Sequence, residues 1–403
     1  MQDVYRNSST TISAIGGAND RAGLFYRRES TKLAPTVIKI KPSAKENYST
    51  FIHPDERDPF TDTARFFLDN VLVARAWCFQ ERLLSPRVLH FGAQQIYWEC
   101  RENTASECHP EDTLSRSRLH SNRDYPVLWK PLISHSDPSV ADDLWGRVFC
   151  EWYHSLYMYS RCQLTVSSDK LIAISGLAND MRRVLRDNWP EREHRYLAGL
   201  WEEELPTSLL WQAIDPGKRS LVYRAPTWSW ASIDAAVQTE TKTNDKVDRQ
   251  WFVSNQDCTA YTECLGPSDT GGVSGGYLEL IGSYAIVELR GSKAQLSCEP
   301  LDDHFKDETS GVQLATSTTA RRVRDLHVAF DTEDDVPEQA LLIPIIAGKL
   351  GSINAEYYME GLVLVRVKDT ERYQRIGLCV GFMGKGEVDR LSENLERRAV
   401  IVI

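Results

Sequence analysis

The sequence predicts an α+β protein in which helices fill the first half of the chain and strands fill the C-terminal half. Apolar residues recur at helical spacing within 63–85 and 138–215. After Gly217, short apolar segments such as 277–290 and 361–367 alternate with Gly, Asp and Thr turns. That texture is typical of strands in a sandwich or rolled sheet.

Composition and charge exclude several classes of protein. The chain has 403 residues and a formal net charge of −10, and it lacks the clustered Lys and Arg that duplex binding needs, so we predict no nucleic-acid partner. Nine Cys without regular spacing predict a reducing, cytoplasmic location rather than a disulfide scaffold. The polar N-terminus is unlike a signal peptide, and no run of about 18 apolar residues predicts a membrane span.

The N-terminal third contains signals for a helix followed by a hairpin. A short strand or turn is expected to end at Gly16-Gly17, and residues 36–60 are expected to form an exposed loop. A helix from about Thr63 should end by Ser85, because Pro86 disfavours helical geometry at the residue before it. Residues 87–91 and 95–100 then predict two strands of a hairpin.

The middle third is predicted to be helical after a polar linker at 103–137. One helix carries a broad apolar face from Val140 to Leu156, and a second is expected to follow an N-cap at Ser168. A third helix is predicted over 195–204. Further on, Trp228 and Trp230 alternate as on one strand face, which favours packing onto a helical layer and leaves a ligand platform as the alternative.

The segment 75–100 resembles the signature of the fungal heterokaryon-incompatibility (HET) domain. The pattern is Arg-x-Trp, two residues, Gln-Glu, then Leu-Ser-x-Arg, an aromatic-bearing strand and Trp-Glu-Cys. Stretches 4–28, 164–178, 196–211 and 223–234 extend the resemblance. The matching residues are Arg75, Trp77, Gln80, Glu81, Leu84, Ser85, Arg87, Phe91, Trp98, Glu99 and Cys100.

The resemblance implies both an architecture and a role. It implies an α/β core similar to TIR domains, which are flavodoxin-like, but the family's opening Ser-Tyr-x-Trp-Gly strand does not occur, so the domain is expected to be partial. We therefore predict a partial HET domain at 1–110, a linker and helical region at 111–215, and a β-rich domain at 216–403. The implied function is non-self recognition in fungi, with the protein as an effector of programmed cell death.

Three mechanisms remain open under this resemblance. The first is a TIR-like cleavage of NAD as substrate, with Glu81 as the catalytic carboxylate and Arg75 as an anion or carboxylate partner, and with no bound cofactor. The second is a non-enzymatic module that binds a protein partner or associates with itself. The third is a degenerate, inactive family member.

The chemistry of Glu81 has a structural alternative. Glu81 follows Trp77 by four residues, so both lie on one helix face, where a partly apolar cleft would raise the pKa of the carboxyl. Alternatively, Glu81 pairs with a nearby arginine (Arg75, Arg82 or Arg87) and braces the junction between helix and hairpin. Trp77 and Trp98 are predicted to be core residues.

Cysteine chemistry has weaker support. Cys100 could act as a nucleophile if His90, on the paired strand, lay beside it, but a buried inert thiol is the simpler interpretation. The spacing of Cys100, Cys108 and His109 fits no short zinc knuckle, so we predict no metal site. Motifs of nucleotide-binding loops, serine hydrolases and zincins do not occur.

Overall fold

The computed structural model forms two compact units, residues 1–191 and 192–403. The structure describes residues 2–19, 21–27, 36–43, 46–52, 71–107, 130, 144–239, 249–296, 326–333, 336–349, 356–393 and 397–403. Both helices and sheets are present, so the predicted α+β class is confirmed. Among the described residues, no helix combines the length and the apolar character that a membrane crossing requires.

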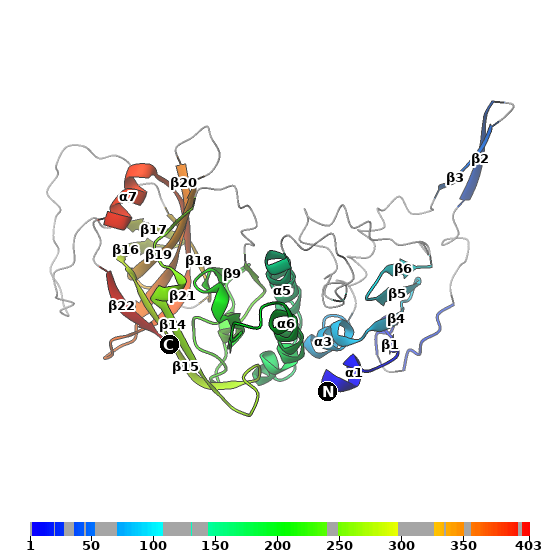
Figure 1. The fold of residues 1–403 in the computed structure, drawn as a ribbon, viewed down its shortest axis with the longest axis horizontal. Coiled ribbons are helices and arrows are strands. Elements are labelled where there is room, and N and C mark those ends of the chain that lie inside the picture. Colours follow the sequence, from blue (N-terminus) through cyan, green and yellow to red (C-terminus); the bar gives the residue numbers. More distant parts are fainter. Residues whose placement is uncertain are drawn as a thin grey trace. The chain divides into compact units, whose positions relative to one another are not determined.

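A four-stranded sheet organises the first unit. Its order is β1-β4-β5-β6, where β1 runs parallel to β4 and the other pairs are antiparallel (Figure 1). The predicted hairpin is confirmed, with Leu89 opposite Trp98. The strands are β1 (Thr11–Ser13), β4 (Arg87–Phe91), β5 (Ile96–Cys100) and β6 (Thr104–Ser106).

Helices of the first unit pack around α3, whose start differs from the prediction. α3 begins at Ala76 rather than near Thr63; Val71 is 64% exposed in a turn before it, and residues 53–70 lie outside the described ranges. The helix expected after Ser168 begins at Ser175, because two 3-10 turns come first. The helical elements are α1 (Gln2–Arg6), α3 (Ala76–Leu84), α5 (Leu144–Ser160), η4 (Ser167–Lys170), η5 (Ile172–Ile174) and α6 (Ser175–Asn188).

The expected exposed loop at 36–60 is wrong for its first part. Residues 36–52 form an antiparallel hairpin of β2 (Thr36–Ser43) and β3 (Glu46–Ile52). Val37, Ile38 and Ile40 are β-branched residues that suit strands, while the charged and Pro residues around them suggested a loop.

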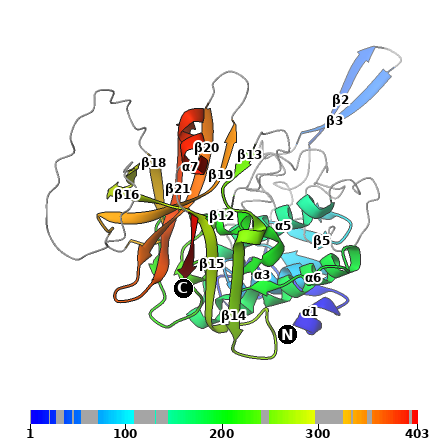
Figure 2. The ribbon, with the colours of Figure 1, turned by 60° about the vertical axis from the view of Figure 1, so that its left-hand side comes forward.

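A closed barrel forms the centre of the second unit. Six antiparallel strands pair around a ring in the order β16-β17-β18-β21-β20-β19, and β19 pairs again with β16 (Figures 1 and 2). The predicted β-rich region is thus a rolled sheet. The six strands are β16 (Ala285–Arg290), β17 (Lys293–Leu296), β18 (Leu326–Phe330), β19 (Gln339–Lys349), β20 (Glu356–Arg366) and β21 (Arg372–Gly384).

One apolar cluster fills the barrel, and the helix α7 (Lys385–Glu393) adds to it. Alternate side chains of the strands, including Val287, Leu342 and Cys379, point into this cluster, as expected for a small barrel filled by side chains. Val388 and Leu391 of α7 belong to the same cluster. The helix follows β21 directly and contacts β20 and β21.

The sheet continues beyond the barrel on two sides. β13 (Arg249–Trp251) pairs with β19, and β22 (Arg397–Val402) pairs with the first residues of β21. In the sheet, β15 (Val273–Ser283) pairs with β22, and β14 (Cys258–Cys264) pairs with β15. Along the chain, the turn η9 (Asn255–Asp257) comes directly before β14. β19 is buried along most of its length, with Ile343 beside Gly282 of β15.

Two further predictions are corrected between residues 192 and 239. The predicted helix at 195–204 is a tight hairpin, because Ala198 and Gly199 adopt positive φ and reverse the chain. The segment with Trp228 and Trp230 is a turn and a 3-10 helix instead of a strand. The elements here are β7 (Tyr196–Leu197), β8 (Leu200–Trp201), η6 (Glu202–Glu204), η7 (Thr207–Leu209), β9 (Trp211–Ala213), β10 (Lys218–Arg219), η8 (Trp230–Ser232), β11 (Ile233–Asp234) and β12 (Val237–Thr239).

Candidate functional site

The candidate site of the first unit is built around α3. Before the helix, the backbone bridges residues 75 and 163, and the amide of Ala76 donates to the carbonyl of Gln163 at 3.0 Å. The helix ends at Ser85, whose hydroxyl donates to the carbonyl of Glu81 at 2.7 Å and lies 2.8 Å from the hydroxyl of Thr11 on β1. The Leu84-Ser85 part of the signature therefore caps α3 and ties it to the sheet.

Two signature residues attach α3 to η4 and to the start of α6. The indole nitrogen of Trp77 donates to the Asp169 carboxylate at 3.2 Å. The side-chain oxygen of Gln80 accepts the amide of Gly176 at 2.6 Å. A Cβ at Gly176 would lie 2.6 Å from that oxygen, so only glycine permits this approach.

The predicted core positions of the two tryptophans need correction. Trp77 and Trp98 are half-buried, whereas Gln80, Leu84 and Ser85 are buried. The polar indole nitrogen of Trp77 explains its place at the margin of the core, where it reaches Asp169. Trp98 lies on the opposite sheet face from Tyr97 and Glu99, which the alternation of β5 directs into the unit.

Glu81 lies in α3, which packs beside α1, and its carboxylate influences Tyr5 of that helix. Its carboxylate is half-buried and lies within electrostatic range of the Tyr5 phenol. Burial, and then the Glu81 carboxylate, raise the pKa of Tyr5 to about 12. The phenol therefore stays protonated near neutral pH.

Cys78 lies within the electrostatic reach of both proposed catalytic residues. Burial raises the pKa of the Cys78 thiol, Glu81 raises it further, and Arg75 lowers it. Arg75 is exposed at the start of α3. The roles of Glu81 and Arg75 in catalysis stay predictions.

A buried ionic cluster surrounds Glu99 beneath the hairpin. The Nε of Arg82 lies 2.7 Å from one carboxylate oxygen, His90 Nε2 lies 3.6 Å from the same oxygen, and Lys130 pairs with the other. Burial opposes ionisation of Glu99, but Arg82, Lys130 and His90 hold its pKa well below the ordinary value of 4.5. Burial lowers the pKa of His90, so its imidazole is neutral at pH 7.

Successive residues of the signature's Trp-Glu-Cys segment lie on opposite faces of the sheet. Glu99 turns inward to the cluster, while Cys100 sits on the other face, opposite Arg87. The Cys100 sulfur bonds locally to Asn103 and accepts the amide of Glu102. His90 therefore faces Glu99 rather than Cys100, which removes the geometry of a Cys–His nucleophile.

The zinc alternative lies partly outside the described structure, since Cys108 and His109 are not among its residues. In the ranges that are described, no group of three or more His, Cys, Asp and Glu side chains is arranged to hold a metal ion.

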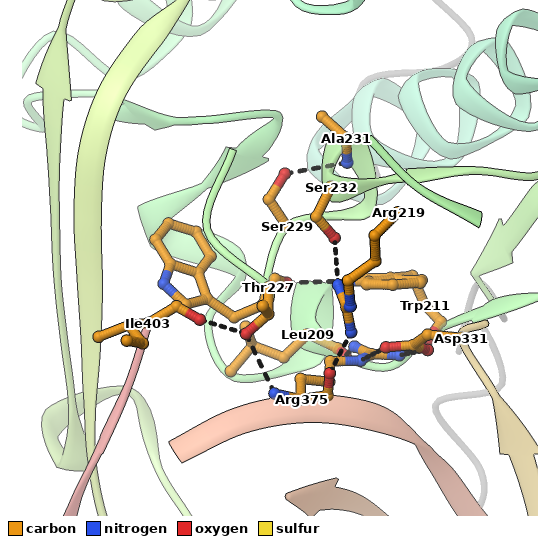
Figure 3. A network of polar contacts seen from close by, with 11 residues as sticks. Leu209, Trp211, Arg219, Thr227, Ser229, Ala231, Ser232, Asp331, Arg375 and Ile403 are labelled. Carbon is orange, nitrogen blue, oxygen red and sulfur yellow. Dashed lines mark hydrogen bonds and ion pairs between the residues drawn. The ribbon is translucent and has the colours of Figure 1, made fainter. Parts of the chain in front are cut away.

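A second polar network, in the second unit, was missed by sequence reasoning. Arg375 on β21 is fully buried and pairs with the equally buried Asp331, Nε to Oδ2 at 3.0 Å (Figure 3). Its guanidinium also donates to the carbonyls of Leu209 and Trp211 and lies 3.5 Å from the Trp211 ring centroid. The one available signal was an arginine at an inward position of an apolar strand.

The tryptophan-rich segment is the partner of this network. Thr227 accepts the amide of Arg375 at 3.0 Å and donates to the carbonyl of Ile403, while Arg219 donates to the carbonyl of Arg375 (Figure 3). The Trp211 indole donates to the carbonyl of Trp228 at 2.9 Å. These bonds are satisfied internally, so the network joins the barrel to β9 and η8, and Trp228 and Trp230 are wholly buried core residues instead of a ligand platform.

Comparison with known proteins supports the resemblance. Residues 1–81 match the family model described as Heterokaryon incompatibility protein (HET). This match confirms the resemblance in the segment that contains α1, β1 and the first half of the α3 signature, through Glu81. No curated protein and no solved structure matches the chain.

Proposed function

We propose that this protein acts in heterokaryon incompatibility, the non-self recognition of fungi, as a cytoplasmic effector of programmed cell death. The observation that carries the proposal is the family match over residues 1–81, which ends within α3. The contacts of Trp77, Gln80 and Ser85 support it, because each signature side chain has a defined bonding role around that helix.

The mechanism that the geometry supports best is a protein-interaction module. Trp77 and Gln80 hold α3 to η4 and α6, Ser85 holds it to β1, and Glu99 is enclosed by cations. Such a rigid packing unit suits recognition of a protein partner or of another copy of the chain. A TIR-like, flavodoxin-like core belongs to this proposal and rests on the resemblance.

Cleavage of NAD is a second candidate, and one observation favours it. The Glu81 carboxylate is partly accessible and lies within electrostatic range of the Tyr5 phenol, so it could still approach a ribose hydroxyl. Arg75, exposed at the start of the same helix, would supply the positive charge for an anionic group.

Expression in a fungal host distinguishes the mechanisms. Cell death is expected for the wild-type chain. An interaction mechanism predicts that death persists in Glu81→Gln and is lost in Trp77→Ala, which removes the bond to Asp169. Enzymatic killing predicts loss in Glu81→Gln with retention in Glu102→Gln, a matched change at an exposed glutamate of the same unit.

A parallel assay follows nicotinamide release from NAD by the purified chain. Release that Glu81→Gln abolishes and Glu102→Gln preserves would support the enzymatic mechanism. Without release, and without death on expression, the third alternative applies, a family member that has lost activity, and the proposed function is rejected.

A further inference from the structure

β14 forms one end of the sheet in the second unit. Among the described strands it pairs with β15 alone, so its other edge carries backbone groups that no described strand pairs (Figure 2). Natural edge strands are usually protected by Lys, Pro or a central bulge. β14 contains neither Lys nor Pro, and its register shift falls at its last residues, Glu263 and Cys264.

The solvent face of the hairpin is aromatic. Tyr261 of β14 lies opposite Tyr277 of β15, with ring centroids 5.8 Å apart. The two residues are 49% and 41% exposed. Tyr261 lies on the edge strand itself, and a side chain of this size supplies cross-strand contacts to an added strand.

An exposed apolar loop lies beside this hairpin. Leu221 is 104% exposed, and Val222 and Tyr223 follow it at the surface. Burial, and then the nearby Glu263 carboxylate of β14, raise the pKa of the Tyr223 phenol. Pro226 approaches Gly276 of β15. Three consecutive exposed apolar residues beside this hairpin mark a surface that fits a protein partner.

We propose that β14 pairs with β14 of a second copy of this chain, antiparallel and about a two-fold axis at Tyr261. Tyr261 is the midpoint of Cys258–Cys264, so this register pairs all seven residues of the strand. Glu263 then faces Thr259 of the other copy and Cys258 faces Cys264. Moving the axis to Ala260 shortens the overlap and places Asp257 opposite Glu263, a like-charge pair.

The proposal goes beyond the role in incompatibility and does not depend on it. Sedimentation equilibrium of the full chain should give a concentration-dependent dimer. Tyr261→Lys places two lysines opposite each other at the axis and should give the mass of a single chain. Tyr277→Lys, the matched control one strand further in, should leave the dimer in place, with circular dichroism confirming that both variants fold.

Cross-linking tests the register directly. In Tyr261→Cys the two new thiols meet at the axis, and the azo compound diamide takes up their two electrons and two protons to become a hydrazine as the disulfide forms. A covalent dimer above the wild-type background is expected, and Tyr277→Cys should not give one. A wild-type chain that is monomeric at every concentration, or equal effects at positions 261 and 277, would overturn the proposal.

Discussion

The indole nitrogen of Trp230 donates a hydrogen bond of 3.0 Å to the carbonyl of Gly199, at the turn of the β7–β8 hairpin. Gly199 has φ +105°, and a Cβ there would lie 2.4 Å from that indole nitrogen. The turn and the tryptophan segment therefore define each other's positions. Ser229 reinforces this by donating to the carbonyl of Ala198.

Gly199→Ala should lower the free energy of unfolding by about 2–4 kcal/mol, through backbone strain and a displaced buried hydrogen bond. Denaturant unfolding measures this loss. Gly291→Ala is the control, since it also has positive φ but no neighbour within 4 Å of a Cβ. A similar loss in both variants would contradict the role of Trp230.

Asp331→Asn should destabilise the second unit by about 3–5 kcal/mol, because it leaves the Arg375 guanidinium buried without its counter-charge. Arg372→Met, an exposed arginine of the same strand, should change stability by less than about 0.5 kcal/mol. Thermal unfolding of the two variants tests the difference, and equal midpoints would show that the ion pair is not needed.

Glu99→Gln should destabilise the first unit by about 3 kcal/mol at neutral pH, since Arg82 and Lys130 would lose their shared counter-charge. Because the folded-state pKa of Glu99 is depressed, its contribution is present above the ordinary pKa of 4.5 and is lost as pH falls toward the lowered value. Stability of the wild type should therefore fall more steeply than that of the variant below pH 4.5. An equal fall in the free energy of unfolding of the two proteins below pH 4.5 would refute this.

His90→Gln should remove a separate pH dependence. Burial lowers the folded-state pKa of His90, so below its ordinary pKa of 6.5 the unfolded chain binds a proton that the folded chain refuses. Wild-type stability should decline from about pH 6.5 downward until the folded-state pKa is reached, and the variant should decline less. Hydrogen exchange in β4 and β5, followed between pH 5 and pH 8, measures the difference.

The sequence predicted those elements whose boundaries are determined by residues close to them in the chain. Pro86 set the end of α3, and the apolar alternation on either side of Gly92 predicted the hairpin. The 195–204 hairpin was missed because Tyr196, Leu197, Leu200 and Trp201 mimic helical spacing, and the reversal depends on positive φ at two residues. A local period cannot distinguish these structures when the element is so short.

The candidate site was predictable in its composition and less so in its contacts. The signature identified Glu81 and Glu99, but it could not show that Tyr5 lies near the first and that Lys130 pairs with the second, because these residues are distant in sequence. The same limit hid Arg375, whose counter-ion Asp331 lies on another segment. Such pairs are brought together by the fold, and the spacing of residues along the sequence does not predict them.

Closure of the barrel limits how far the sheet of the second unit can grow by strand addition. A strand inside a ring offers no free edge, so among the described strands only β13 and β14 end the sheet. β13 has three residues, too few for stable pairing by itself. Once two copies join through β14, each has used the longer end of this sheet, so growth of this sheet stops at a finite pair instead of continuing as a fibre.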